Sequence, residues 1–117
     1  INSCEGRNLI INCMKHWYVY IMVNKPNGIL YIGVTNNIDE RVKEHKLKAH
    51  PKSFTAKYNC DILVYFEEFE NGDEATTREK RFKKWKRDWE IRLIEEMNPS
   101  WSDLSLNWNI NYNKLRI

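Results

Sequence analysis

The sequence contains four side chains whose chemical types suit work on a phosphate group. Tyr20 and Tyr31 carry hydroxyls. Arg41 carries a guanidinium, which fits a phosphate because its planar fork donates two parallel hydrogen bonds and stays charged. Glu79 carries a carboxylate, and a hard cation such as Mg²⁺ prefers one or two carboxylates with water and phosphate oxygens. Phosphate and a divalent cation are therefore the candidate ligands.

Each of these residues also has a structural interpretation. Aromatic pairs such as Tyr20 and Tyr31 pack across antiparallel strands without any further function. Arg41 can form a salt bridge with a nearby acid, and Glu79 can pair with a cation of its own helix. His45, one turn after Arg41, suits the role of an acid, a base or a hydrogen-bond donor, but a lone histidine on an apolar face is more often a satisfied core group. Taken singly, the residues leave both interpretations open.

The two tyrosines fall in segments with the composition of β-strands. Residues 17–23 and 29–34 are rich in aromatic and β-branched side chains, and the turn-forming sequence NKPNG separates them. The Asn-Gly pair in that turn tolerates positive φ, as a chain reversal requires. We therefore expect a β-hairpin. Because side chains alternate along a strand, Tyr31 and Gly33 share one of its faces.

A helix is expected over residues 38–46. The preceding asparagines can cap it, and its first turn contains two acids, which the N-terminal dipole favours. Helical spacing places Arg41 and His45 on the same stripe as the apolar Ile38 and Val42. A charged group on an inward stripe needs a reason, so this helix is a candidate contributor to the site.

The second half of the chain predicts one more strand and more helix. Residues 47–59 are polar and basic, and we expect a loop with at most one short helical turn. Residues 61–69 predict a third strand. From 73 to 97 the apolar spacing is helical without a breaker, which fits one long helix or two abutting helices. Glu79 falls beside Ala75 and Phe82 on the inward side of that helix.

Residues 78–87 (REKRFKKWKR) form the most basic segment, in which every ionisable side chain except Glu79 is cationic. Such a concentration of positive charge is a candidate for contact with nucleic-acid phosphates. The alternative is a solvated helix face. The candidate DNA-binding side chains are Arg78, Lys80, Arg81, Lys83 and Lys84.

Length and composition indicate a single soluble domain. A chain of 117 residues fits one core, and no apolar run approaches the roughly 18 residues of a membrane span. The net charge of +3 and the pI of about 8.8 support a nucleic-acid partner only weakly. Cys4, Cys13 and Cys60 are odd in number and lack paired spacing, so we expect neither a disulfide framework nor a zinc site, and a reducing cytoplasm fits.

The two ends of the chain differ from its middle. Residues 1–13 lack the features of a secretory signal, and Met14 stands directly before the first strand pattern. We expect these residues to be a leader outside the fold, with a genuine N-terminal arm as the alternative. The domain is expected over 14–108, and residues 109–117 as a polar tail.

Taken in order, the candidate residues resemble the GIY-YIG nuclease family. Residues 18–20 (YVY) and 31–33 (YIG) correspond to its two namesake tripeptides, the second completely and the first at its last tyrosine only. Arg41 and His45 continue the family's order. The resemblance covers residues 17–104. More narrowly, the chain resembles the small single-domain bacterial members that are similar to the N-terminal nuclease domain of excinuclease C.

The resemblance implies an α+β fold with a small three-stranded antiparallel sheet flanked by helices, and a shallow cleft over the tyrosine face. It also implies four catalytic side chains, one metal ligand and one glycine that lets a backbone or phosphate approach closely. In this sequence these are Tyr20, Tyr31, Arg41 and His45; Glu79; and Gly33.

The function that the resemblance implies is a metal-dependent endonuclease that hydrolyses DNA phosphodiester bonds with Mg²⁺ or Mn²⁺. Its expected setting is DNA repair or the processing of branched or single-stranded DNA. One alternative is a catalytically weak nucleic-acid-binding module with the same fold, since the many Trp and Tyr side chains are able to stack on bases. The other is an interaction domain in which the tyrosines and Glu79 are structural.

Overall fold

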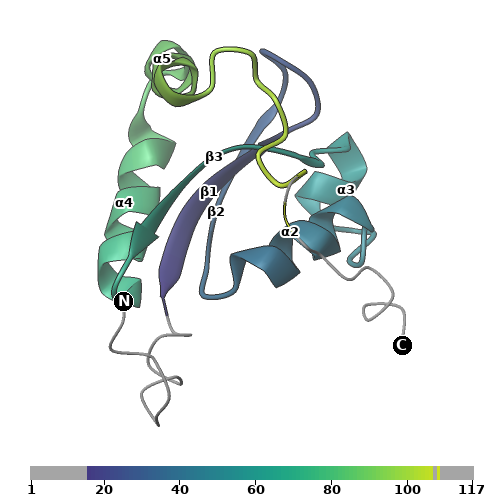
Figure 1. Ribbon diagram of the computed structural model, residues 1–117, viewed down its shortest axis with the longest axis horizontal. Helices are drawn as coiled ribbons and strands as arrows, with labels where there is room; N and C mark the ends of the chain where they lie inside the picture. Colours follow the sequence, from purple (N-terminus) through teal and green to yellow (C-terminus); the bar gives the residue numbers. More distant parts are fainter. Residues whose placement is uncertain (1–15, 107, 109–117) are drawn as a thin grey trace, which may run out of the picture.

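The computed structural model describes residues 16–106 and 108. Its elements, in chain order, are β1 (Trp17–Val23), β2 (Leu30–Thr35), α2 (Ile38–Lys46), α3 (Phe54–Tyr58), β3 (Ile62–Phe69), α4 (Gly72–Lys84) and α5 (Arg87–Met97). The three strands form one antiparallel sheet in the order β2-β1-β3, with helices on both faces (Figure 1). The expected α+β class with a three-stranded antiparallel sheet is confirmed. The expected leader and polar tail lie outside the described residues.

The predicted hairpin is formed by β1 and β2. Asn27 has a φ of 58°, and the Gly28 amide donates to the Lys25 carbonyl at 2.9 Å. In the register of the pair, Tyr20 stands opposite Gly33. Met22 stands opposite Tyr31, so the two tyrosines are diagonal neighbours on one face of the sheet.

The central strand β1 is buried on both faces, and each face has its own core. On one face, Val19 and Ile21 pack with Ala75 and Phe82 of α4 and with residues of α5. On the other face, Tyr20 and Met22 pack with Ile38 and Val42 of α2 and with Cys60 and Leu63. Figure 1 shows α4 and α5 on one side of the sheet and α2 and α3 on the other. The tyrosine face is therefore the face that α2 covers.

The helical span after β3 divides into two helices, the second of the two arrangements that the pattern allowed. Trp85 and Lys86 both have extended backbone, with ψ angles of 154° and 151°, and they separate α4 from α5. Within the polar segment 47–59, the short helical turn is α3, which Ser53 caps by accepting from the Ala56 amide. No helix within residues 16–106 is long and apolar enough to cross a membrane.

A segment after α5 returns to the tyrosine side of the molecule. The buried Asn98 side chain donates to the Val64 carbonyl at 3.1 Å, which fixes the start of this segment on β3. Further along, the Asp103 carboxylate pairs with the Lys46 ammonium at the end of α2. Hydrogen bonds, one ion pair and the apolar packing of Trp101 and Leu104 thus hold this segment, which has no regular helix or strand, against the sheet.

Candidate active site

Tyr20 is the innermost residue of the site. Its ring is fully buried, and its hydroxyl lies 2.9 Å from Nε2 of His45. A Cβ atom at position 33 would lie 2.5 Å from that hydroxyl and 2.6 Å from Cζ, closer than real contacts allow. Glycine is therefore required at 33 because the Tyr20 ring lies against the backbone there. The close approach expected at Gly33 is thus occupied by a side chain of the protein itself.

His45 has a hydrogen-bond partner at each ring nitrogen. Nε2 faces the Tyr20 hydroxyl, and Nδ1 lies 2.8 Å from Oγ1 of Thr55 in α3. Burial, with smaller effects of Arg41 and His50, lowers the pKa of His45 to about 4, so the ring is neutral at physiological pH. Neutral imidazole carries one N–H and one acceptor nitrogen, which matches a ring held between two hydroxyls.

The Tyr20 phenol keeps its proton at neutral pH. Burial raises its pKa, and the nearby Tyr31 adds to this rise. The Arg41 guanidinium acts in the opposite direction through its charge and a hydrogen bond, but burial dominates. Tyr20 is therefore unsuited to act as a base and suited to donate a hydrogen bond.

Tyr31 is the tyrosine that reaches the surface of this cluster. Its half-buried ring lies 6.2 Å from the Tyr20 ring and 5.5 Å from the His45 ring, measured between centroids. On its other side it stacks on Phe54 of α3, with centroids 5.8 Å apart and planes 30° apart. Tyr31 thus connects the buried Tyr20–His45 pair to a more exposed aromatic side chain.

Arg41 brings a positive charge to the same place. It lies one helical turn before His45 in α2, and its positive charge favours lower pKa values for Tyr20 and His45, although burial outweighs it at Tyr20. Its side chain is 41% exposed, and Nε lies 3.3 Å from a carboxylate oxygen of Glu44. An exposed pair of this kind contributes only about 0–1 kcal/mol, so an incoming phosphate can compete for the guanidinium. The structure therefore brings together Tyr20, Tyr31, Arg41 and His45.

Glu79 comes from α4, the helix that packs on the opposite face of the sheet. Its side chain is only 15% exposed, as its expected place beside Ala75 and Phe82 implies. Its carboxylate pairs with the Lys83 ammonium at 2.7 Å. Lys83 in turn lines a surface hollow together with Tyr31. Glu79 is thus one helical turn from a residue that borders the tyrosine cluster.

Glu79 offers one carboxylate, the minimum that a divalent cation of the magnesium type requires from a protein. Within residues 16–106, no three His, Cys, Asp or Glu side chains are grouped as a metal cluster. Mg²⁺ does not require such a group, since one carboxylate suffices when water and substrate phosphate complete the shell. A cation at Glu79 would replace Lys83 as the partner of the carboxylate.

The basic segment divides over two places. Arg78 is held by Glu67 through two hydrogen bonds of 2.9 Å, and its guanidinium lies 4.5 Å from the centre of the Phe82 ring.

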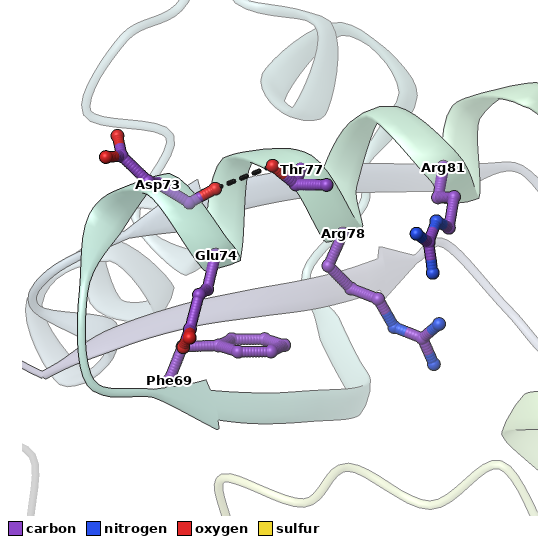
Figure 2. A pocket seen from close by; sticks show the side chains of 6 residues that line it. All are labelled: Phe69, Asp73, Glu74, Thr77, Arg78 and Arg81. Atoms are coloured by element: carbon purple, nitrogen blue, oxygen red, sulfur yellow. Dashed lines mark hydrogen bonds between the residues drawn. The ribbon is translucent and has the colours of Figure 1, made fainter.

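Figure 2 shows Arg78 and Arg81 in a hollow that also contains Phe69, Asp73, Glu74 and Thr77. This hollow lies beside β3, whereas Lys83 borders Tyr31 of β2. Lys80 and Lys84 are exposed. Of the five candidate DNA-binding side chains, Lys83 is therefore the one placed at the tyrosine cluster.

Two residues of α3 complete the site and were missed in the sequence. Thr55, only 2% exposed, bonds His45, and Phe54 stacks on Tyr31. The only local signal was Ser53, which suits a helix cap. It predicts a helical turn, but not which side chains of that turn face the tyrosines.

Comparison with known proteins identifies the family. The GIY-YIG catalytic domain matches residues 16–92, a range that contains every residue of the candidate site. The chain is similar to a UPF0213 protein of Clostridium perfringens, with 43% identity over 77 residues that span 66% of this chain and 81% of the relative. It is also similar to a UPF0213 protein of Staphylococcus haemolyticus, with 38% identity over 82 residues that span 70% and 96%. No solved structure gives a significant match. The chain belongs to the GIY-YIG family.

Proposed function

We propose that this protein is a metal-dependent endonuclease that hydrolyses phosphodiester bonds of DNA, in repair or in the processing of branched or single-stranded DNA. The GIY-YIG catalytic domain is a nuclease-type domain. The observation that carries the proposal is the convergence of Tyr20, Tyr31 and His45, joined by hydrogen bonding and ring contacts, beside the partly exposed Arg41.

The roles follow from exposure and charge. Arg41 is charged and partly exposed, so it binds the phosphoryl oxygens and stabilises the charge that accumulates on them. Tyr31 is half-buried at the surface of the cluster, and its hydroxyl orients the attacking water. Tyr20 and His45 lie deeper and hold Tyr31 in place through ring contacts. As the new P–O bond forms and the old one breaks, the attacking water gives a proton to solvent and the leaving oxygen takes one from solvent.

Glu79 would hold the divalent cation, Mg²⁺ or Mn²⁺. Such a cation, when bound, polarises the scissile phosphate and makes a bound water more acidic. The side chains of the protein supply the rest: Arg41 fixes the phosphate, Tyr31 orients the water, and Lys83 releases the Glu79 carboxylate. Lys83 is 54% exposed, so its ammonium remains solvated when it moves away.

The alternative function is a nucleic-acid-binding module that cleaves poorly. One observation favours it: the Glu79 carboxylate already has a cationic partner at 2.7 Å. If Lys83 outcompetes a divalent cation for that carboxylate, binding to DNA is retained and hydrolysis is lost.

Cleavage of DNA by matched variants separates the two functions. The full chain would be incubated with supercoiled, single-stranded and branched DNA in Mg²⁺ or Mn²⁺, beside Glu79→Gln and Arg41→Ala. We expect at least about a 100-fold loss of nicking in both variants, because each removes one electrostatic contribution to the transition state. Glu96→Gln, at an exposed glutamate of α5, is the matched control and should cleave normally.

The outcome is unambiguous when DNA binding is measured alongside nicking. Metal-dependent nicking that disappears in Glu79→Gln, with DNA binding retained, supports the enzyme. Binding by the wild type without nicking in either metal supports the module instead. Nicking that survives both substitutions would reject the assignment of the site.

A further inference from the structure

A hollow of about 480 Å³ adjoins Tyr31 at the β2 edge of the sheet. Its walls are residues 29–32 of the hairpin, Phe54 of α3, and the polar side chains Lys83, Arg87 and Glu90. The volume falls within the roughly 300–1,000 Å³ that small-ligand sites occupy. Three different parts of the chain therefore form one concave surface next to the proposed site of cleavage.

The α3 side of this hollow continues as a row of three aromatic rings in contact, Tyr31, Phe54 and Tyr58. Tyr31 stacks on Phe54, and Phe54 lies 4.8 Å from the Tyr58 ring, centroid to centroid. Phe54 is 45% exposed and Tyr58 is 37% exposed, so large apolar rings remain in contact with solvent. Phe54 contributes to both the row and the hollow. Planar apolar surface of this kind suits another flat ring.

The charged groups at the hollow show which part of a nucleotide fits there. Arg87 donates to the carbonyls of Asn27 and Gly28 at 2.6 Å each, which fixes its guanidinium at the hairpin turn. Lys83 is 54% exposed, and its ammonium can meet a phosphate at the rim. Glu90 places a carboxylate in the same hollow, and a carboxylate repels phosphate but accepts from the amino group of a base. The interior therefore suits a base, and the rim suits the phosphate next to it.

We propose that this hollow binds an unpaired nucleobase, stacked on Phe54, of the nucleotide that adjoins the scissile phosphate. In a duplex the faces of each base are covered by its neighbours and its edge is paired, so a base enters the hollow only from a single-stranded segment or after extrusion. The preferred substrate is thus DNA with a single-stranded segment at the site of cleavage. This inference rests on the proposed function, because it places the base relative to a cleaved bond.

Binding to single-stranded and duplex DNA, measured in EDTA, tests the proposal without cleavage. The probe is an oligonucleotide that carries the fluorescent base 2-aminopurine, used alone and annealed to its complement. We expect Phe54→Leu to weaken single-strand binding about fivefold or more, since base–aromatic stacking contributes about 1–3 kcal/mol per base. Duplex affinity should change less than about twofold. Trp89→Leu, at a ring on α5 that is 53% exposed, is the matched control.

The second variant, Tyr58→Leu, keeps the test usable if Phe54→Leu fails to fold. Fluorescence quenching of 2-aminopurine by the wild type, reduced in Phe54→Leu or Tyr58→Leu but not in Trp89→Leu, supports the proposal. Equal losses of single-strand and duplex affinity, or equal losses in all three variants, would overturn it. The binding assay contains no metal, so its result does not depend on cleavage. If the wild type binds single strands selectively in EDTA but never nicks DNA when metal is added, the proposed function is wrong and the base site stands. Metal-dependent nicking with no effect of Phe54→Leu on single-strand binding would do the reverse.

Discussion

Two hydroxyl groups flank the His45 ring, one at each nitrogen, and each of them can donate or accept a hydrogen bond. The Tyr20 phenol keeps its proton, because burial raises its pKa, so it is a natural donor to Nε2. We therefore predict that Nδ1 carries the hydrogen and donates to Oγ1 of Thr55, which lies 2.8 Å away. We propose that Thr55 is a positioning residue that acts through His45 on Tyr20 and, by ring contact, on Tyr31.

Replacing Thr55 by valine should alter the tautomer and orientation of His45 while the fold is retained. Valine has the shape of threonine but leaves Nδ1–H without its partner, which costs about 1–3 kcal/mol of stability. We expect a roughly tenfold loss of cleavage, because a displaced ring misplaces the groups that it supports. Nitrogen NMR shifts of His45 report the tautomer directly, and they should show Nδ1 protonated in the wild type.

Thr55→Ser is the matched control, because serine restores the hydroxyl without the methyl group. It should recover both the tautomer and most of the activity. If valine and serine behave alike, Thr55 is only a packing residue. If His45 has the same tautomer in all three proteins, the Tyr20–His45–Thr55 chain does not govern its proton.

At the scale of the elements, local sequence signals predicted where strands and helices lie and which way their faces point. They did not predict which distant segments contact one another. The hairpin could be predicted because its turn residues and alternating strands act within a few positions of one another. The inward stripe of α2 could be predicted because Ile38 and Val42 set its direction for Arg41 and His45. The third strand and the helical span behind it could be predicted for the same reason, since each has its own local periodicity.

Contacts between distant segments could not be predicted in this way. Glu67 takes Arg78 out of the basic segment, but the two are on different elements and no spacing rule relates them. The segment before α3 has no periodicity, so nothing in it shows that Phe54 meets Tyr31 and Thr55 meets His45. The break between α4 and α5 occurs at Trp85 and Lys86, which are neither glycine nor proline. The sequence therefore predicted which strand or helix face each candidate residue occupies. It did not predict the contacts that Phe54 and Thr55 of α3 make with those residues.

The division of α4 between two hollows gives a prediction about charge. Lys83 lies at the hollow of Tyr31, whereas Arg81 lies with Asp73 and Glu74 beside β3. A lysine that contacts a phosphate contributes about 0.7–0.9 to the slope of log affinity against log salt. Lys83→Gln should therefore reduce this slope for single-stranded DNA by about 0.7, and Arg81→Gln should leave it almost unchanged.

The measurement is a salt titration of DNA binding in EDTA, so the effect of Lys83 on the Glu79 carboxylate does not enter through a metal. Both substitutions remove one positive charge from the same helix, so each controls for net charge. Equal changes in slope would mean that the whole basic helix, rather than its Lys83 side, meets the nucleic acid.

At the scale of the whole molecule, the sheet separates an apolar core on one face from a core that contains the candidate site on the other. The core on the α4 and α5 face is apolar, with Val19, Ile21 and Phe82 at its centre. The core on the α2 face contains the polar Tyr20–His45–Thr55 chain together with apolar residues. The Lys46–Asp103 pair fastens the last described segment to that same face. Titration of the candidate site should therefore affect the stability of the whole molecule.

Acid should destabilise the protein through His45. The pKa of this residue is lowered to about 4 by burial and by the positive charge of Arg41, against 6.5 in the unfolded chain. Between these two values the unfolded state binds more protons at His45 than the folded state does. The contribution of His45 to the free energy of unfolding is therefore complete above pH 6.5 and is lost as pH falls towards 4. Lowering the pH from 7 to 5 should cost about 1 kcal/mol through this residue, after allowance for its partial exposure to solvent.

Urea unfolding at the two pH values measures the loss. His45→Gln, which cannot titrate, should show a smaller loss than the wild type. His50→Gln, at a side chain that is 72% exposed, should retain most of the wild-type loss. A wild-type loss that persists in full in His45→Gln would assign the acid sensitivity to other groups and would contradict a neutral, buried His45.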